Sequence, residues 1–236
     1  MLGRVAEQSI AMALSSLWAR LPQERLVGIG YAVPFLDRFR ADTERTFAFM
    51  PAGQGAVNWP VGEPSATALV FDEELPLPDA SIDRVLMVHS LEFAENPRET
   101  LKEVWRVLAP GGLCVITTPN RLLISPGRDE PLNPFHIIEY DARQLADFMR
   151  SFYAGVNMLG VFHARKLRLH DILSGRNFSQ FCLDMPPRLE RLFYRPLFIP
   201  SIRTRDFRLR DSGFHEAVDF IAIGRKSSAG GERGGG

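Results

Sequence analysis

Residues 75–121, LPLPDASIDRVLMVHSLEFAENPRETLKEVWRVLAPGGLCVITTPNR, decide the fold of this chain. Within them, residues 82–88 are almost continuously apolar, as expected of a parallel strand that is covered on both faces. A helix is expected to begin at Asn96-Pro97, because proline is well tolerated in a first turn, and residues 113–118 form a second buried strand. The order strand, helix, strand predicts one parallel βαβ unit.

The predicted helix of this unit has one apolar face. Its apolar residues recur with the i, i+3, i+4, i+7 spacing of such a face, namely Leu101, Val104, Trp105 and Leu108. We expect Pro110-Gly111-Gly112 to end the helix, because proline and glycine both interrupt helical structure.

The alternation of strands and helices continues on both sides of this unit. Further strands are expected at 25–29, 45–50, 66–71, 155–162 and 217–224, and further helices at 3–20, 35–40, 142–151, 166–173 and 187–194. Asp141 precedes the helix at 142–151 and is a typical N-cap residue. The pattern predicts an α/β fold with a doubly wound, mostly parallel sheet.

Length and composition favour a single domain. The chain has 236 residues, of which 45% are hydrophobic, and this is enough for one sizeable core. We assign residues 1–226 to that domain, with 163–215 as its least regular part. The tail 227–236 is rich in glycine and serine, so we expect it to be disordered.

Charge and cysteine content limit the partners and the compartment. The 28 basic and 28 acidic residues cancel, which argues against nucleic acid as a partner. No apolar run approaches the roughly 20 residues of a membrane span, so no membrane contact is expected. Cys114 and Cys182 show neither a disulfide framework nor metal-ligand spacing, which favours a reducing, cytoplasmic location.

A short glycine motif follows the first expected strand. Gly28-Ile29-Gly30 precedes a helix, and such glycines let a cofactor approach the backbone beside a helix N-terminus. Val33 breaks the dinucleotide fingerprint, and Met50 stands where an acid that binds ribose would end the second strand. Both departures argue against NAD, and a plain tight turn is the alternative interpretation.

Residues 25–121 resemble the class I S-adenosylmethionine-dependent methyltransferases, most specifically over 75–121. The resemblance implies S-adenosylmethionine as the cofactor and a Rossmann-like, seven-stranded sheet with an antiparallel last strand. It implies a glycine-rich cofactor loop, a contact near the adenine, and two residues that face the methionine part and the substrate. The matching positions are Gly28, Gly30 and Ala32 for the loop, Asp72 near the adenine, and His89 and Ser90. Residues 163–215 then correspond to the place where the family elaborates a substrate cap.

Two polar anchors of the family are absent. Leu26 occupies the position of an acid that interacts with the amino-acid part of the cofactor, and Met50 occupies the position of the ribose-binding acid. Backbone groups, Gln54 or Asn58 are the available replacements.

A long polar loop follows the strand at 113–118. Its segment Asn133-Pro-Phe-His136-Ile-Ile-Glu139-Tyr140 resembles the substrate-side loop of methyltransferases that act on sugars and other small hydroxyl compounds. His136 is therefore the candidate general base, since the ordinary pKa of histidine suits proton transfer near neutrality. Glu139 is the candidate residue that orients it. The alternative is that both residues stabilise the loop, and His89 is a second candidate base.

These features predict methyl transfer to a small-molecule substrate, with two alternatives. The missing anchors favour a methyltransferase-like binding or regulatory protein without turnover. The arginine-rich segment 188–210 favours an RNA or protein methyltransferase, although a solvated face explains it more simply. His163 and His170 lack a well-spaced acidic partner, so no metal site is expected. The oligomeric state is left open.

Overall fold

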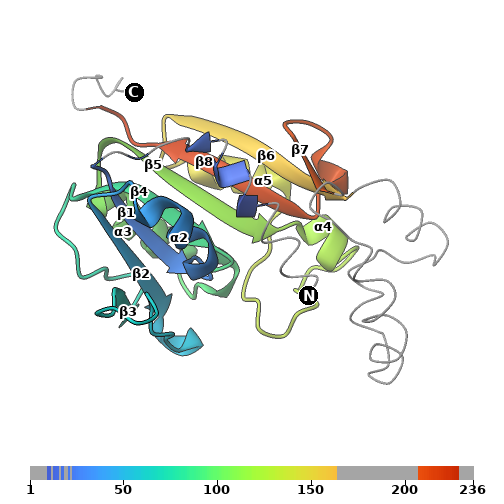
Figure 1. Ribbon diagram of the computed structural model, residues 1–236. Coiled ribbons are helices and arrows are strands. Elements are labelled where there is room, and N and C mark those ends of the chain that lie inside the picture. The colour runs from blue at the N-terminus through green and yellow to red at the C-terminus, as the bar shows by residue number, and fades with distance from the viewer. Residues whose placement is uncertain are drawn as a thin grey trace.

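An eight-stranded sheet forms the centre of the computed structural model, which describes residues 10–11, 13–15, 17–18, 21, 23–163 and 207–228 (Figure 1). The strands lie in the order β3-β2-β1-β4-β5-β8-β6-β7. Their bounds are β1 Arg25–Gly30, β2 Arg45–Pro51, β3 Thr67–Val70, β4 Ile82–Val88, β5 Leu108–Pro119, β6 Gly155–His163, β7 Phe207–Arg210 and β8 Asp219–Arg225. Every strand expected from the sequence is present.

The sheet is parallel through its first five strands. β1 pairs with β2 and β4, β2 with β3, and β4 with β5, all in the parallel sense. β8 runs antiparallel to both β5 and β6, so the expected antiparallel last strand is confirmed. β7 is one strand more than predicted, and it pairs antiparallel with β6. Its sequence, FRLR, lies in the arginine-rich segment and is too short to give a clear periodic signal.

Helices flank the sheet at positions close to those expected. They are α2 Val33–Arg40, α3 Pro97–Val107, α4 Arg121–Ile124 and α5 Ala142–Arg150, with single 3-10 turns η1 Ala52–Gln54, η2 Leu91–Phe93 and η6 Phe214–Glu216. The N-terminus of α5 is a capping box, in which Asp141 accepts from the Gln144 amide and the Gln144 side chain accepts from the Asp141 amide. The predicted cap is confirmed.

The ends of the chain and the segment before β7 are described only in part. Residues 10–11, 13–15 and 17 are helical, as expected from the sequence. The remainder of the helix expected at 3–20, the helices expected at 166–173 and 187–194, and residues 229–236 lie outside the described residues. No helix in the described part of the chain is long and apolar enough to span a membrane.

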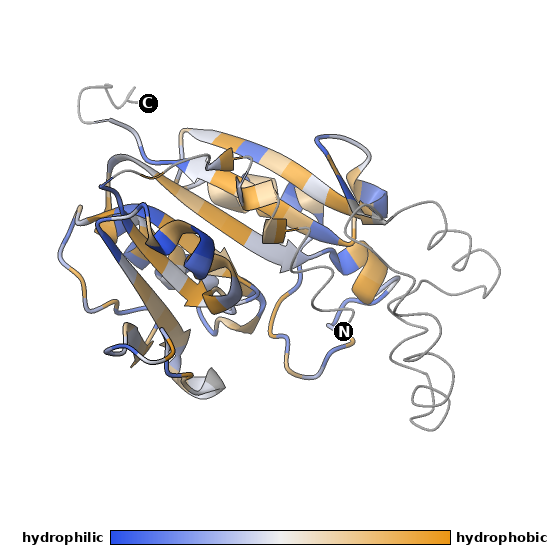
Figure 2. Ribbon diagram, viewed as in Figure 1, coloured by the Kyte–Doolittle hydropathy of each residue, from blue (hydrophilic) through white to orange (hydrophobic). Residues whose placement is uncertain are grey.

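Two hydrophobic layers cover the two faces of the sheet. Alternate residues of each strand point to opposite faces, so Val27 and Ile29 enter one layer and Leu26 the other. The first layer contains residues of α3 and α5, including Leu101, Val104, Leu145 and Met149. The second contains residues of the N-terminal helix and α2, including Ile10, Leu14, Phe35 and Leu36. Figure 2 shows β5 as predominantly hydrophobic and paler toward its carboxyl end.

The Pro110-Gly111-Gly112 segment does not end the helix as predicted. α3 ends at Val107 and β5 begins at Leu108, so the segment lies inside the strand. There it forms a bulge, because Ile82 of β4 pairs with Leu108 whereas Arg84 pairs with Leu113. Gly111 has a φ of +79°, which favours glycine. The four residues between Leu108 and Leu113 are thus accommodated opposite a single residue of β4.

Candidate functional site

The strand order places a switch point between β1 and β4. From β1 the chain proceeds outward to β2 and β3 and then returns to β4 on the other side of β1. In open α/β sheets, ligands bind at the carboxyl edge of such a point. Gly30 and Val88 are paired at that edge. His89 and Ser90, which follow Val88, therefore lie at this edge of the sheet.

Both glycines of the first loop are required by close packing. A Cβ on Gly28 would lie 2.6 Å from the Ala32 Cβ, so this glycine lets α2 pack against β1. Gly30 has a φ of +76°, and a Cβ there would lie 2.6 Å from the Ser90 Cβ and 2.7 Å from the Val88 carbonyl oxygen. The loop is consequently a tight turn that brings the ends of β1 and β4 together.

Asp72 lies just after β3 and faces α3. Its Oδ2 accepts a hydrogen bond from the Thr100 hydroxyl over 3.2 Å. Burial raises the pKa of Asp72, and the Thr100 hydrogen bond only partly opposes this shift. The carboxyl group therefore links the loop after β3 to α3.

The positions of the two missing anchors are filled by apolar packing. Leu26 is completely buried in the core. Met50 is 6% exposed, and its sulfur accepts a hydrogen bond from the Val57 amide over 3.0 Å. The loop after β2 folds back onto α2, where the Trp59 indole donates to Asp37 over 2.8 Å. Of the two candidate replacements, the side chain of Asn58 is exposed and that of Gln54 lies outside the described residues.

His89 lies at the carboxyl end of β4 in an unusual backbone conformation. Its φ is +45°, which is uncommon for a residue with a side chain. Its Nδ1 is 3.0 Å from the Glu92 Oε1. Glu92 is buried, with 1% of its side chain exposed, and its Oε2 accepts from the Thr118 hydroxyl over 3.2 Å. The carboxylate of Glu92 is thus held between the ends of β4 and β5.

Asp219 adds a second carboxyl group near this histidine. It opens β8 and is paired with Pro119 at the end of β5. Burial raises the pKa of Asp219, as does the charge of Glu92, whereas His89 lowers it. Burial alone would lower the pKa of His89, but the Glu92 hydrogen bond and the charges of Asp219 and Glu92 outweigh this effect and raise it to about 9. This shift favours the protonated, cationic form of His89.

His136 and Glu139 form a second pair of the same kind. The His136 Nδ1 is 2.7 Å from the Glu139 Oε1, and the two side chains are 10% and 1% exposed. The imidazole packs edge-on against Phe93, with ring centroids 5.0 Å apart. The Glu139 Oε2 is buried and has no hydrogen-bond partner within the part of the chain that the structure describes. The expected partnership of His136 and Glu139 is present.

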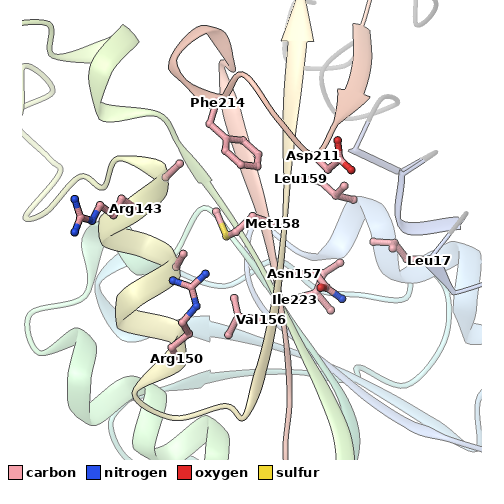
Figure 3. A pocket seen from close by; sticks show the side chains of 12 residues that line it. Leu17, Arg143, Arg150, Val156, Asn157, Met158, Leu159, Asp211, Phe214 and Ile223 are labelled. Carbon is pink, nitrogen blue, oxygen red and sulfur yellow. The ribbon is translucent and has the colours of Figure 1, made fainter.

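A cavity adjoins the second pair. It has a volume of about 360 Å³, and Arg121, Ile137, Glu139, Tyr140 and Gln144 are among its lining residues. A larger cavity of about 740 Å³ is lined by residues of α5 and β6, including Ala146, Arg150 and Met158 (Figure 3). None of the predicted site residues lines the larger cavity. We therefore associate the smaller one with the site.

The structure brings some of the predicted site residues together near the ends of β4 and β5, whereas Asp72 lies after β3 and contacts α3. Gly30, His89 and Ser90 meet at the switch point, and the loop of His136 and Glu139 lies beside them. Glu92 and Asp219 were not predicted from the sequence. The spacing His-x-x-Glu, which occurs at both 89–92 and 136–139, was the available signal for Glu92. In the described ranges, no group of three or more potential ligands could hold a metal ion.

Comparison with known proteins finds similarity to methyltransferases. Residues 13–116 match the methyltransferase domain family. A probable S-adenosylmethionine-dependent methyltransferase of Mycolicibacterium smegmatis is 36% identical over 160 residues, which are 64% of this chain and 60% of that relative. The chain thus matches less than two thirds of its curated relative's length.

Solved structures share the fold. A methyltransferase from Thermotoga maritima, described as a possible histamine N-methyltransferase, superposes on this chain with a TM-score of 0.60 at 19% sequence identity. The superposition covers 95% of this chain and 91% of the Thermotoga chain. The 4+2 cyclase SpnF superposes with a TM-score of 0.57 at 18% identity, covering 95% and 82%. Residues 13–116 of this chain therefore match the methyltransferase domain family, and the chain shares its fold with these solved structures.

Proposed function

We propose that this protein transfers the methyl group of S-adenosylmethionine to a hydroxyl of a small molecule. The family match and the curated relative support the cofactor and the reaction class. The observation that carries the proposal for a hydroxyl acceptor is the His136–Glu139 pair beside the carboxyl edge of the sheet. A hydroxyl must lose its proton during methylation, and a carboxylate-oriented histidine is suited to accept it.

The residues at the switch point fit the cofactor. Gly28, Gly30 and Ala32 would hold the cofactor at the turn after β1, Asp72 would contact the adenine, and His89 and Ser90 would contact the methionine part. The Ser90 hydroxyl is buried beside Gly30 and has no hydrogen-bond partner among the described residues, so it is available to bond a ligand at the junction of β1 and β4. The bound cofactor supplies an electrophilic methyl group on a sulfonium.

His136 would accept the acceptor's proton at Nε2. Glu139 occupies Nδ1, which fixes the ring orientation and leaves the lone pair of Nε2 available. The acceptor oxygen forms a bond to the methyl carbon as the carbon–sulfur bond breaks, and the hydroxyl proton passes to His136. Positioning of the oxygen supplies much of the acceleration, because the reaction is a displacement between two held groups.

The size of the adjacent cavity favours a small acceptor. Pockets for small molecules have volumes of about 300–1,000 Å³. The cavity of about 360 Å³ beside Glu139 lies at the lower end of this range. Its lining includes apolar Ile137 and polar Arg121 and Gln144, which could bind the rest of the acceptor. We also propose a cytoplasmic location, in line with the buried free thiol of Cys114.

A protein that binds the cofactor without methyl transfer is the second candidate. The apolar packing of Leu26 and Met50 favours it, because both usual acids are missing. The fold also occurs in a cyclase. One experiment distinguishes the two functions. It follows the transfer of a labelled methyl group from S-adenosylmethionine to a panel of sugars, phenols and aliphatic alcohols. Label in any acceptor supports the enzyme, whereas cofactor binding without label in any of them supports the second candidate.

A further inference from the structure

The cavity beside Glu139 has one basic residue in its lining. The volume of the cavity is about 360 Å³, and Arg121 is the single lysine or arginine among the described residues that line it. The Arg121 side chain is 27% exposed, so most of it is shielded from bulk water. Apolar side chains are also part of the wall, namely Pro131, Ile137 and Ile138. A charged group beside such a wall interacts more strongly with a ligand than one in open solvent.

The backbone of Arg121 is held firmly just after β5. Asn120 is completely buried, and its side-chain nitrogen donates to the carbonyl oxygens of Phe214 and Ala217 over 3.0 and 2.7 Å. The Arg121 amide donates to the Tyr140 carbonyl oxygen over 3.0 Å. These bonds fix the backbone that carries the Arg121 side chain, so a ligand in the cavity has little backbone left to order.

The Arg121 guanidinium uses only a small part of its hydrogen-bonding capacity on the described residues. Its Nη2 donates to the Arg128 carbonyl oxygen over 2.6 Å. The Asp129 Oδ1 lies 3.9 Å from the same nitrogen, which is too far for a hydrogen bond, and the Asp129 side chain is fully exposed. A guanidinium carries several N–H donors in a planar fork that matches a carboxylate or a phosphate group. Arg121 can therefore bind an anionic ligand in the cavity.

Gln144 supplies a second donor in the lining. Its side-chain oxygen accepts from the Asp141 amide over 3.0 Å in the capping box of α5. The side-chain nitrogen of Gln144 then has no hydrogen-bond partner among the described residues, although the residue lines the cavity. Arg121 and Gln144 thus both offer N–H groups to a ligand in the cavity.

Glu139 gives the cavity a hydrogen-bond acceptor. Its Oε1 lies 2.7 Å from the His136 Nδ1, whereas its Oε2 is buried and has no partner in the ranges that the structure describes. Such an oxygen favours a ligand that carries a donor, and a hydroxyl is the donor of the proposed function. An anionic group would be repelled by a carboxylate here and attracted by Arg121. The lining therefore distinguishes the hydroxyl end of a ligand from an anionic end.

We propose that Arg121, assisted by Gln144, binds an anionic oxygen group of the acceptor, so that the acceptor is a small hydroxy acid or a hydroxylated phosphate ester. The inference rests on the proposed function, because it takes the acceptor's hydroxyl to lie at the His136–Glu139 pair. Charge-assisted hydrogen bonds from Arg121 hold the anionic group, and repulsion by Glu139 keeps that group away from the base. Arg121 is then a specificity-determining residue that takes no part in proton transfer.

Calorimetric titration of the full chain with benzoate, phenyl phosphate and neutral benzamide tests anion binding without any methyl transfer. We expect at least one of the two anions to bind about ten- to hundredfold more tightly than benzamide, which is the usual effect of hydrogen bonds to a charged group. Arg121→Gln should remove this preference. Arg128→Gln is the matched control, because it removes the same charge from an exposed side chain outside the cavity lining. The anion that binds more tightly identifies the carboxylate or the phosphate form of the acceptor.

Methyl transfer to matched phenols tests the same residue during the reaction. The anionic meta-hydroxybenzoate and meta-hydroxyphenyl phosphate are each compared with neutral meta-hydroxybenzamide. Arg121→Gln should raise the KM of the preferred anion about ten- to hundredfold, with kcat changed by a few-fold at most and the KM of the amide unchanged, because only the anion is bound by the guanidinium. Arg121→Lys should restore part of the preference, since it keeps the charge but not the planar fork.

The outcomes separate the inference from the proposed function. A preference for the anions that is absent, or that survives Arg121→Gln, overturns the inference even when neutral hydroxyl compounds are methylated. Anion binding that is lost in Arg121→Gln, without methyl transfer to any hydroxyl compound, supports the anion site and overturns the proposed function. Equal effects of Arg121→Gln on the charged and the neutral phenols would show a structural role only, and this result also overturns the inference.

Discussion

The amide of Ile137 donates to the carbonyl oxygen of Glu92 over 2.7 Å, and this bond joins the loops after β4 and β5. The Ile138 amide reaches the same oxygen over 3.3 Å. Phe93 packs against His136 on the same side. The two histidine–glutamate pairs are therefore parts of one structure at the carboxyl edge of the sheet, although 47 positions separate their histidines in the sequence.

Replacement of His136 tests its role as base. We expect His136→Gln to reduce methyl transfer by about 10²- to 10⁴-fold, because this is the usual contribution of general-base catalysis. Binding of S-adenosylhomocysteine should remain within twofold, since His136 lies on the acceptor side. His215→Gln is the control, because His215 is 73% exposed. Methyl transfer that survives in His136→Gln would show that another group accepts the proton.

Gly30→Ala tests the packing of the switch point. The added Cβ would lie 2.6 Å from the Ser90 Cβ, in a backbone conformation with a φ of +76°. We expect a loss of about 1–3 kcal/mol in the free energy of unfolding. Gly53→Ala is the matched control, because a Cβ added there would meet no atom within 4 Å beyond its chain neighbours. Urea denaturation measures both, and equal effects at the two positions would contradict the packing argument.

The stability of the protein should depend on pH through His89. Burial alone would lower the pKa of His89, but the carboxyl groups of Glu92 and Asp219 outweigh this effect and raise the pKa from 6.5 to about 9. The native state therefore binds the proton more tightly than the unfolded state. This stabilisation is fully present below about pH 6.5 and is lost as the pH rises through about 9.

Urea denaturation of the protein and of His89→Asn, at pH 6, 7.5 and 9.5, checks this dependence. The free energy of unfolding of the unmodified protein should exceed that of the variant most at pH 6 and least at pH 9.5. A difference that grows with pH would contradict the assignment of His89 as a stabilised cation.

Asp141→Ala tests the start of α5. The aspartate accepts from the Gln144 amide over 2.8 Å, and removal of such a cap costs about 1 kcal/mol. Asp211→Ala is the control, since Asp211 is an exposed residue outside the helices. Thermal unfolding compares them. A melting temperature that responds equally to both substitutions would count against the capping box.

The buried parallel strands were predictable because their signal is local. Residues 82–88 form β4 with the expected bounds, since a strand covered on both faces needs a continuous apolar run. The cap at Asp141 was predictable for the same reason, because its partner is three residues away. The bulge at Pro110–Gly112 was not, because the helix end and the bulge share the same residue preferences and only pairing with β4 separates them.

The candidate site was predictable only in part. His136 and Glu139 stand in a polar loop, which draws attention to them. Glu92 lies between Leu91 and Phe93, and its burial between the ends of β4 and β5 depends on contacts with Thr118 that the local sequence does not reveal. Asp219 is even more distant from His89 in the sequence. Its charge acts on His89 only because β8 pairs antiparallel with β5.

Calorimetric titration with S-adenosylhomocysteine tests the central claim, that this domain is built for S-adenosylmethionine, most directly. We predict saturable binding of one ligand per chain, with a dissociation constant between about 1 μM and 1 mM, the usual range for enzymes and their small ligands. The absence of any binding at millimolar ligand would contradict the claim, and it would mean that the apolar residues Leu26 and Met50 have abolished the cofactor site.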